Sequence, residues 1–238
     1  MENHPFFTYN DTFIAYGWQH LSILGLIAFL SFLIPYGADR YLNYFQRIWV
    51  SRCIAIIIAF WAFLWIGIYW WLGDFELARH LPLDICNIVA VLLPFLMWKP
   101  RFSVHEIIYF WILAGTLQGL LTPHLSNNYP NFEWWKYWIV HGGLVVYAVY
   151  ITVVFRFYPT WRSLWRSFWA ANLYLVFVYC VNYLLGSNYA YLMGKPPVAS
   201  ALDLMGPYPW YILTGQIVAF VLFVLVWLPV RIFGKKQA

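Results

Sequence analysis

Seven long apolar stretches are the feature of this sequence that most restricts its fold. They cover approximately residues 17–36, 50–72, 81–98, 104–122, 137–156, 165–185 and 209–231. Each is long enough to cross the ~30 Å hydrocarbon core of a bilayer as a helix. Of the 238 residues, 63% are hydrophobic and only 10% are charged, a composition that argues against a water-soluble fold. The sequence therefore predicts an all-α membrane protein with seven transmembrane helices, forming a single polytopic domain over residues 1–238.

The Lys and Arg residues are distributed unequally between the two ends of these predicted helices. Of the fourteen, only Arg79, Lys136 and Lys195 fall on one side, and all the others fall on the opposite side. Because cytoplasmic loops collect Lys and Arg, we expect the N-terminus outside and the C-terminus in the cytoplasm. The net charge of +5 then reflects topology and anionic lipid headgroups. We expect membrane phospholipid as a partner and no nucleic acid, since no basic stripe is present.

The three cysteines show none of the spacings of a disulfide or zinc framework. Cys53, Cys86 and Cys180 all fall inside predicted spans and show no CxxC spacing, so neither a disulfide framework nor a zinc ribbon is expected. The first sixteen residues lack Lys, Arg and a small-residue cleavage site, which argues against a cleaved signal peptide.

Polar residues gather at the predicted outer ends of these spans. Ionisable groups at membrane depth are costly, and they often mark a functional site. His20 opens the first span, Asp84, Cys86 and Asn87 lie in the third, and His141 lies in the fifth. Further candidates, all at the same end, are His124, Asn182, Asn188, Trp210 and Tyr211. Together they predict an outward-opening polar pocket between helices.

Helix geometry restricts which residues of the third span can line that pocket. Asp84 and Asn87 lie about 60° apart on a regular helix, whereas Asp84 and Cys86 lie about 160° apart. Both Asp84 and Cys86 can therefore face one site only if the backbone after Pro82 is irregular. Proline lacks a backbone donor, and broken backbone is tolerated at membrane depth where it lines a cavity.

Three kinds of chemistry fit these residues. In nucleophilic acyl transfer, His141 accepts a proton from Cys86 or a hydroxyl, and Asn87 or backbone amides near Pro82 hold the oxyanion. In metal-assisted lipid hydrolysis, His20, Asp84, His124 and His141 bind zinc. In the third, the pocket binds a lipid or small solute without catalysis, as in a transporter.

Several short motifs resemble one known family. They are LPLDICN at 81–87, LLTPH at 120–124, VHGG at 140–143, GSNYAYL at 186–192 and GPYPWYIL at 206–213. Together they resemble the YwaF-like bacterial integral membrane family, which implies a multi-pass protein of the bacterial plasma membrane. A vertebrate transmembrane relative of that family is an acyltransferase that builds ether phospholipids, with a cysteine and a histidine proposed as catalytic.

This resemblance implies roles for particular residues. His141 corresponds to the family's histidine in the fifth span. If the vertebrate Pro-Cys-His motif is placed on Pro82, its cysteine falls at Leu83 and its histidine at Asp84, whereas Cys86 fits the bacterial LPLxxC pattern. The resemblance therefore favours a cofactor-free enzyme that transfers or hydrolyses phospholipid acyl groups. A zinc-dependent hydrolase and a non-catalytic lipid or solute transporter are the alternatives.

Overall fold

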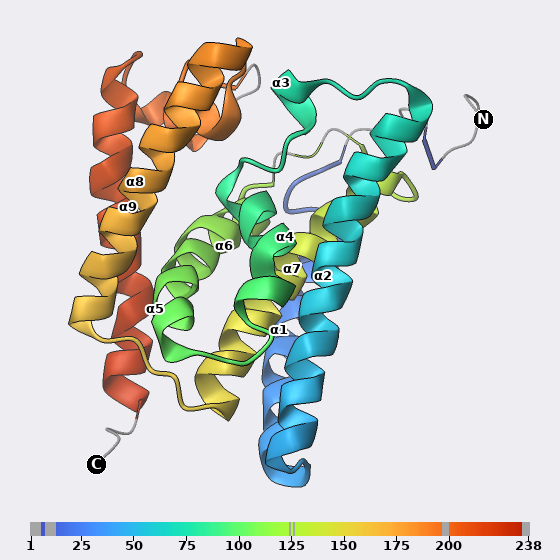
Figure 1. The fold of residues 1–238 in the computed structure, drawn as a ribbon, viewed down its shortest axis with the longest axis vertical. Coiled ribbons are helices and arrows are strands. Elements are labelled where there is room, and N and C mark those ends of the chain that lie inside the picture. Colours follow the sequence, from blue (N-terminus) through green and yellow to red (C-terminus); the bar gives the residue numbers. More distant parts are fainter. Residues whose placement is uncertain (1–5, 8–12, 124, 126, 197–199, 235–238) are drawn as a thin grey trace.

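The computed structural model describes residues 6–7, 13–123, 125, 127–196 and 200–234, and within these ranges the chain forms helices and loops without β-strands (Figure 1). The helices, in chain order, are α1 (Trp18–Tyr41), α2 (Tyr44–Leu72), α3 (Leu77–His80), α4 (Ile85–Leu96), α5 (Phe102–Phe110), the π-helix η1 (Trp111–Thr116), α6 (Leu117–Leu121), α7 (Phe132–Val154), α8 (Trp161–Leu185), the short 3₁₀ helices η2 (Tyr189–Tyr191) and η3 (Ala201–Met205), and α9 (Trp210–Phe233).

Six helical segments of the described chain are long and apolar enough to cross a membrane. Five are the single helices α1, α2, α7, α8 and α9, and the sixth, Phe102–Leu121, combines α5, η1 and α6. Large apolar side chains cover the outside of this bundle; Leu173 and Ile232, for example, are 74% and 68% exposed. A protein with this surface is stable only in lipid. The prediction of an all-α, multi-pass membrane protein is confirmed.

The predicted third span differs from the other six. Its helix, α4, has only 12 residues and rises ~18 Å, which is short of the ~30 Å hydrocarbon core. Leu81 and Asp84, which precede it, have ψ angles of 142° and 143°, and the Leu83 amide donates to the Leu81 carbonyl at 2.9 Å in a tight turn at Pro82. Four residues before the helix add at most ~13 Å. Pro82 explains the break, since it cannot supply a backbone donor and disfavours helix at the residue before it.

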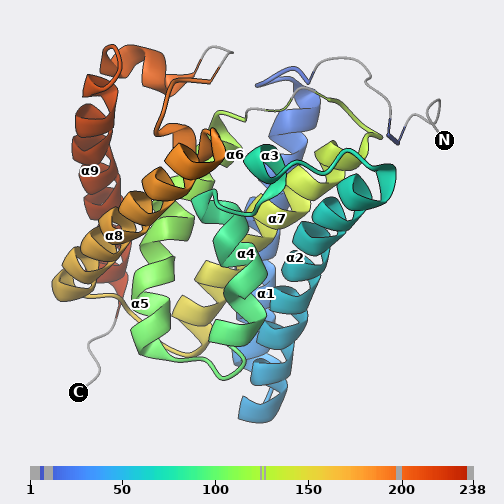
Figure 2. The same ribbon diagram turned by 45° about the horizontal axis from the view of Figure 1, so that its top comes forward.

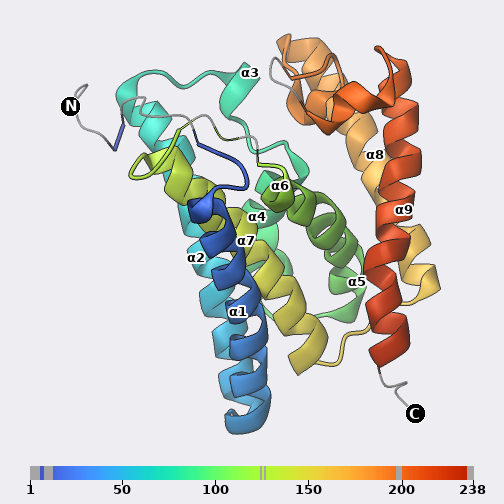
Figure 3. The same ribbon diagram turned by 180° about the vertical axis from the view of Figure 1, so that it is seen from behind.

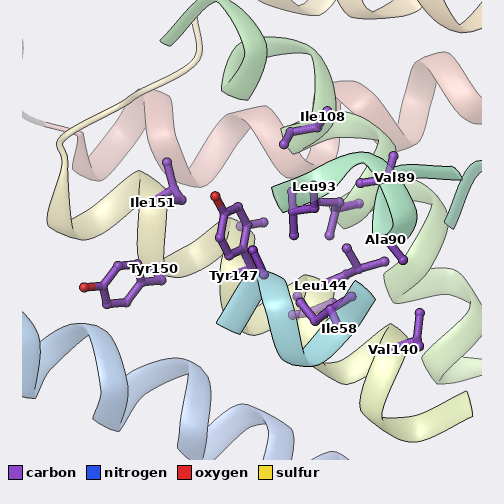
Figure 4. Packing of buried hydrophobic residues seen from close by; sticks show 14 of the residues in the cluster. Ile58, Val89, Ala90, Leu93, Ile108, Val140, Leu144, Tyr147, Tyr150 and Ile151 are labelled. Carbon is purple, nitrogen blue, oxygen red and sulfur yellow. The ribbon is translucent and has the colours of Figure 1, made fainter. Parts of the chain in front are cut away.

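Helix α7 forms the centre of the structure. Tyr147, Tyr150 and Ile151 on this helix are fully buried, and they belong to one apolar cluster with Ile58 of α2 and Leu93 of α4 (Figure 4). Helices α1, α2, α4, η1 and α6 surround α7. The pair α8 and α9 instead packs against α5 and η1, on the side away from α1 and α2 (Figures 2 and 3). The principal apolar core therefore lies along α7.

The ends of α8 are fixed by local signals. Thr160 and Ser163 form a capping box at its N-terminus, where each side chain accepts from the other residue's backbone amide. Gly186 ends the helix with a φ of 63°, in the left-handed region that glycine adopts without strain. This glycine turns the chain back toward α3 and α4, and so places the loop that covers the candidate site.

Gly142 permits the close approach of α1 and α7, and replacing it should destabilise the fold. A Cβ atom at Gly142 would lie 2.8 Å from Cδ1 of Ile27. We expect Gly142→Val to reduce the free energy of unfolding by roughly 1–3 kcal/mol through overpacking. Thermal unfolding of the purified protein in detergent measures this change.

The matched control is Gly25→Val, because nothing lies within 4 Å of a Cβ at Gly25. A second Ile27→Ala change should restore much of the stability lost in Gly142→Val. Equal destabilisation by the two glycine variants would contradict this account of the contact.

Candidate functional site

A chain of hydrogen bonds joins three polar side chains within the bundle. Lys136 Nζ on α7 donates to Asn87 Oδ1 at 3.0 Å, and Asn87 Nδ2 on α4 donates to Asp84 Oδ2 at 3.3 Å. This arrangement fixes the orientation of the Asn87 amide, since its oxygen faces the ammonium and its nitrogen faces the carboxylate. Lys136 also lies 4.5 Å above the ring of Trp65, a favourable position for a cation. We call these three residues, together with Cys86 and His141, the polar cluster.

Cys86 is the second residue of α4 and packs against the main apolar core. Thr116 Oγ1 donates a hydrogen bond to the Cys86 Sγ atom at 3.2 Å. Thr116 is the last residue of η1, the π-helical segment of the span Phe102–Leu121. Single π-helical turns inside α-helices occur frequently at functional sites, and here the altered helical winding immediately precedes α6, where Gly119 faces His141.

His141 is held in a single orientation on α7. Its Nδ1 lies 2.8 Å from the backbone carbonyl of Tyr137, and its ring stacks on the Tyr137 ring at 4.2 Å. Because a carbonyl only accepts, Nδ1 carries a proton, and in the neutral ring Nε2 carries the lone pair. Nε2 makes no hydrogen bond with the described residues. It is therefore available as a base.

Gly119 on α6 leaves space beside this nitrogen. A Cβ atom at Gly119 would lie 3.9 Å from His141 Nε2. The Tyr137 hydroxyl donates to the Gly119 carbonyl at 2.6 Å and so ties α6 to α7 next to the imidazole. A larger side chain at Gly119 would cover Nε2.

Cys86 and His141 both lie against the segment from Thr116 to Gly119, since Thr116 bonds the thiol and Gly119 faces the imidazole. Among the described residues no hydrogen bond joins the thiol to the imidazole. Lys136 lies within electrostatic range of both, and the five residues of the polar cluster are each half-buried. The backbone irregularity required to bring Asp84 and Cys86 together is present, because the helix begins only at Ile85.

The loop after α8 is attached to the segment before α4. The Ala190 amide donates to Asp84 Oδ1 at 3.0 Å, and the Tyr174 hydroxyl donates to the Leu83 carbonyl at 2.8 Å. Ala190 and Tyr191 have φ angles of 54° and 52°, a left-handed conformation that is uncommon for residues other than glycine. Asp84 therefore both belongs to the polar cluster and stabilises an unusual loop backbone.

Tyr189 connects the same loop to α3. Its hydroxyl donates to the Leu77 carbonyl at 2.6 Å and accepts from the Leu81 amide at 2.9 Å. Burial raises the pKa of this phenol, so it stays neutral and able to donate at physiological pH.

Four further sequence-predicted residues lie in or beside this loop. Asn182 is fully buried and bonds the backbone nitrogen and oxygen of Tyr189 and the hydroxyl of Ser187. Asn188 bonds the backbone of Met193 and Gly194, and the Tyr211 hydroxyl donates to the Tyr191 carbonyl. Trp210 is 64% exposed at the start of α9. Asn182, Asn188 and Tyr211 thus shape the loop, whereas Trp210 faces outward.

His20 is separate from the polar cluster. It is fully buried, its Nδ1 accepts from the Tyr16 amide at 2.9 Å, and its Nε2 lies 2.8 Å from the Leu120 carbonyl. Both nitrogens are therefore used to tie α1 to α6. His124 lies outside the described residues. Within the described part of the chain no group of three or more His, Cys, Asp or Glu is placed to hold a metal ion, so the zinc alternative gains no support.

Lys136, Thr116 and Gly119 are the site residues that sequence reasoning missed. The sequence predicts a helix that begins at residue 137, which places Lys136 in an outer loop. In the structure α7 begins at Phe132, so Lys136 lies inside the helix. His141 consequently lies deeper, ~14 Å along the axis from Phe132. A lysine inside a span is a functional signal in its own right, and placing the helix start correctly would have revealed it.

Removing the Asp84 carboxylate should loosen the loop that it supports. We expect Asp84→Ala to increase hydrogen–deuterium exchange of the Ala190 and Tyr191 amides, because the side chain that accepts from Ala190 is lost. Mass spectrometry of the exchanged peptide measures the effect. Asp74→Ala is the control, because that residue is exposed and its carboxylate supports no loop amide; equal exchange in the two variants would contradict this role.

Comparisons with known proteins agree with the membrane fold. The model of the TMEM164 family matches residues 15–227, which include the whole polar cluster. No curated protein matches the chain, and no solved structure matches it.

Proposed function

We propose, on the premise that the chain belongs to the TMEM164 family, that it is a membrane-embedded enzyme acting on phospholipid acyl groups by transfer or hydrolysis. The observation that carries this proposal is the tautomer of His141 and its unbonded ring nitrogen. Its Nδ1–H is held by a backbone carbonyl, and its Nε2, which makes no hydrogen bond with the described residues, lies beside Gly119 of α6. A fixed tautomer with one free nitrogen is what a general base requires.

In the proposed reaction, His141 Nε2 takes the proton of the Cys86 thiol as sulfur attacks the acyl carbonyl of a phospholipid ester. The carbon–oxygen bond of the ester breaks, and the departing lysophospholipid alkoxide receives the proton from His141. The acyl group now forms a thioester with Cys86. A hydroxyl of an acceptor lipid, or water, then loses its proton to His141 and attacks the thioester, which releases the new ester or the free fatty acid and restores the thiol.

The neighbours of Cys86 support this role. Burial disfavours a free thiolate, but the hydrogen bond from Thr116 and the nearby Lys136 charge favour it. Moving the proton directly to His141 during attack avoids an isolated buried charge. Because Asn87 Nδ2 already donates to Asp84, we assign stabilisation of the oxyanion to the Lys136 ammonium, and Asn87 and Asp84 to positioning that ammonium.

The route for an acyl chain follows α7. Val145 lies one turn after His141 on the same face and lines an apolar groove of about 1090 Å³ between α1, α6 and α7. The groove also contains Leu24 and Leu121. An acyl chain with its ester at His141 would extend into this groove and remain in apolar surroundings.

The proposed topology has seven crossings, of which six are helical and one consists of α4 with residues Leu81 to Asp84. With the N-terminus outside, the polar cluster faces the outer half of the membrane and the C-terminus is cytoplasmic. This placement in a multi-pass cell-membrane protein is supported by the excess of Lys and Arg at the opposite end.

Replacing either member of the proposed catalytic pair should abolish acyl transfer. We expect Cys86→Ala and His141→Ala each to lower the rate by roughly 10²–10⁴-fold, since general acid–base catalysis contributes about that factor. The assay uses purified protein in nanodiscs with an isotope-labelled acyl chain on the phospholipid. Mass spectrometry follows lysophospholipid, free acid and re-esterified product, and intact mass detects an acyl adduct on Cys86.

Cys53→Ala and Cys180→Ala are the matched controls, because both cysteines are exposed on the outside of the bundle. Full activity of folded Cys86→Ala would exclude the thioester route. An absence of acyl release by the wild-type protein, together with retention of lipid, would favour the non-catalytic binding or transport alternative.

Neutralising Lys136 should reduce the rate without unfolding the protein. We expect Lys136→Met to lower acyl transfer by about 10²-fold, the usual cost of losing an oxyanion-stabilising group. Lys195→Met is the control, since Lys195 pairs with Asp203 in the loop after α8 at 3.6 Å. A Lys136→Met protein with a wild-type rate and an unchanged thermal midpoint would show that this ammonium has no catalytic part.

A further inference from the structure

The groove between α1, α6 and α7 has a charged end opposite to the polar cluster. From Leu24 to Pro35, the side chains of α1 that line the groove are apolar, except for Ser31. Tyr36 comes next, and Asp39 and Arg40 line the groove where α1 ends. Along α1 the rise from Leu24 to Arg40 is ~24 Å, most of the ~30 Å hydrocarbon thickness. The Arg40 end therefore lies in the half of the membrane away from His141.

Positive charge exceeds negative charge at this end. Asp39 pairs with Arg47 at 3.3 Å and with Arg156 at 2.7 Å. Arg40 makes no ion pair or hydrogen bond with the described residues, is exposed, and lines the groove directly. Among the described residues at this end, one carboxylate therefore faces three guanidinium groups, which gives a net positive charge beside an apolar groove.

From this juxtaposition we propose that the Arg40 end of the groove is a binding site for an anionic phospholipid, distinct from the catalytic cluster. The lipid phosphate bonds the Arg40 guanidinium, and one acyl chain lies against Pro35 and Val153. Arginine binds phosphate with two parallel hydrogen bonds, and basic pockets between transmembrane helices recognise anionic headgroups. The adjoining apolar wall selects a lipid over a soluble phosphate, because only the lipid has a chain to bury there.

A second groove on the neighbouring face offers an internal comparison. It has a volume of about 530 Å³, lies between η1, α7 and α9, and is lined by residues such as Leu113, Val149 and Pro229. No charged side chain lines it within the described residues. It can hold an acyl chain but has no group to recognise a negative headgroup.

The test measures which lipids remain bound to the full-length protein. Protein reconstituted in nanodiscs of phosphatidylcholine mixed with phosphatidylglycerol is extracted in mild detergent, and native mass spectrometry counts the retained lipids. The wild-type protein should retain phosphatidylglycerol preferentially. We expect Arg40→Gln to reduce this preference about fivefold, the factor that one arginine near a membrane surface contributes. Ala28→Trp, which fills the groove, should reduce retention of both lipids.

Arg231→Gln is the matched control, since Arg231 is an exposed arginine in the last turn of α9 and does not line the charged groove. An unchanged preference in Arg40→Gln, or an equal loss in Arg231→Gln, would overturn the proposal. Inorganic phosphate should not displace the bound lipid, and displacement would show that a free anion suffices. Cys86→Ala should still retain phosphatidylglycerol preferentially. The acyl-transfer proposal can therefore fail while this lipid site is confirmed, and the lipid site can fail while acyl transfer is confirmed.

Discussion

The hydrogen-bond chain that runs from Lys136 through Asn87 to Asp84 and then to the Ala190 amide is the interaction on which the site depends. An ammonium and a carboxylate inside an apolar bundle are costly unless each has a partner. Here a single amide side chain satisfies both, one through its oxygen and the other through its nitrogen. The same chain joins α7, α4 and the loop after α8, so the geometry of the cluster and the position of the covering loop are set together.

The two ends of the α1–α6–α7 groove have different chemistry, and this difference organises the functional proposals. At one end, Val145, which lies one turn after His141 on α7, lines apolar space. At the other end, Arg40 has no ion pair among the described residues and lies beside Asp39, which pairs with two other arginines. A bilayer has two leaflets of ~15 Å each, so one groove of this length can meet a substrate chain from one leaflet and an anionic lipid from the other.

Sequence reasoning succeeded where a residue's own chemistry decided its place. The break before α4 followed from proline's missing donor, and Asp84 and Asn87, which a regular helix places on one face, are hydrogen-bonded to each other. It failed for Lys136 because the start of α7 was placed five residues late, at a Trp-rich stretch that resembles an interface. It also did not separate His20 from the cluster, since partners such as the Leu120 carbonyl are distant in sequence.

The amino-acid sequence by itself determined that this chain is a helical, multi-pass membrane protein, because long apolar runs can satisfy their backbone in lipid only as helices. Only the tertiary structure decided that His141 keeps Nε2 free, that Thr116 bonds Cys86, and that Asn87 links Lys136 to Asp84. These facts depend on the rotation and depth of separate helices against one another, which side-chain packing fixes and hydropathy alone does not specify.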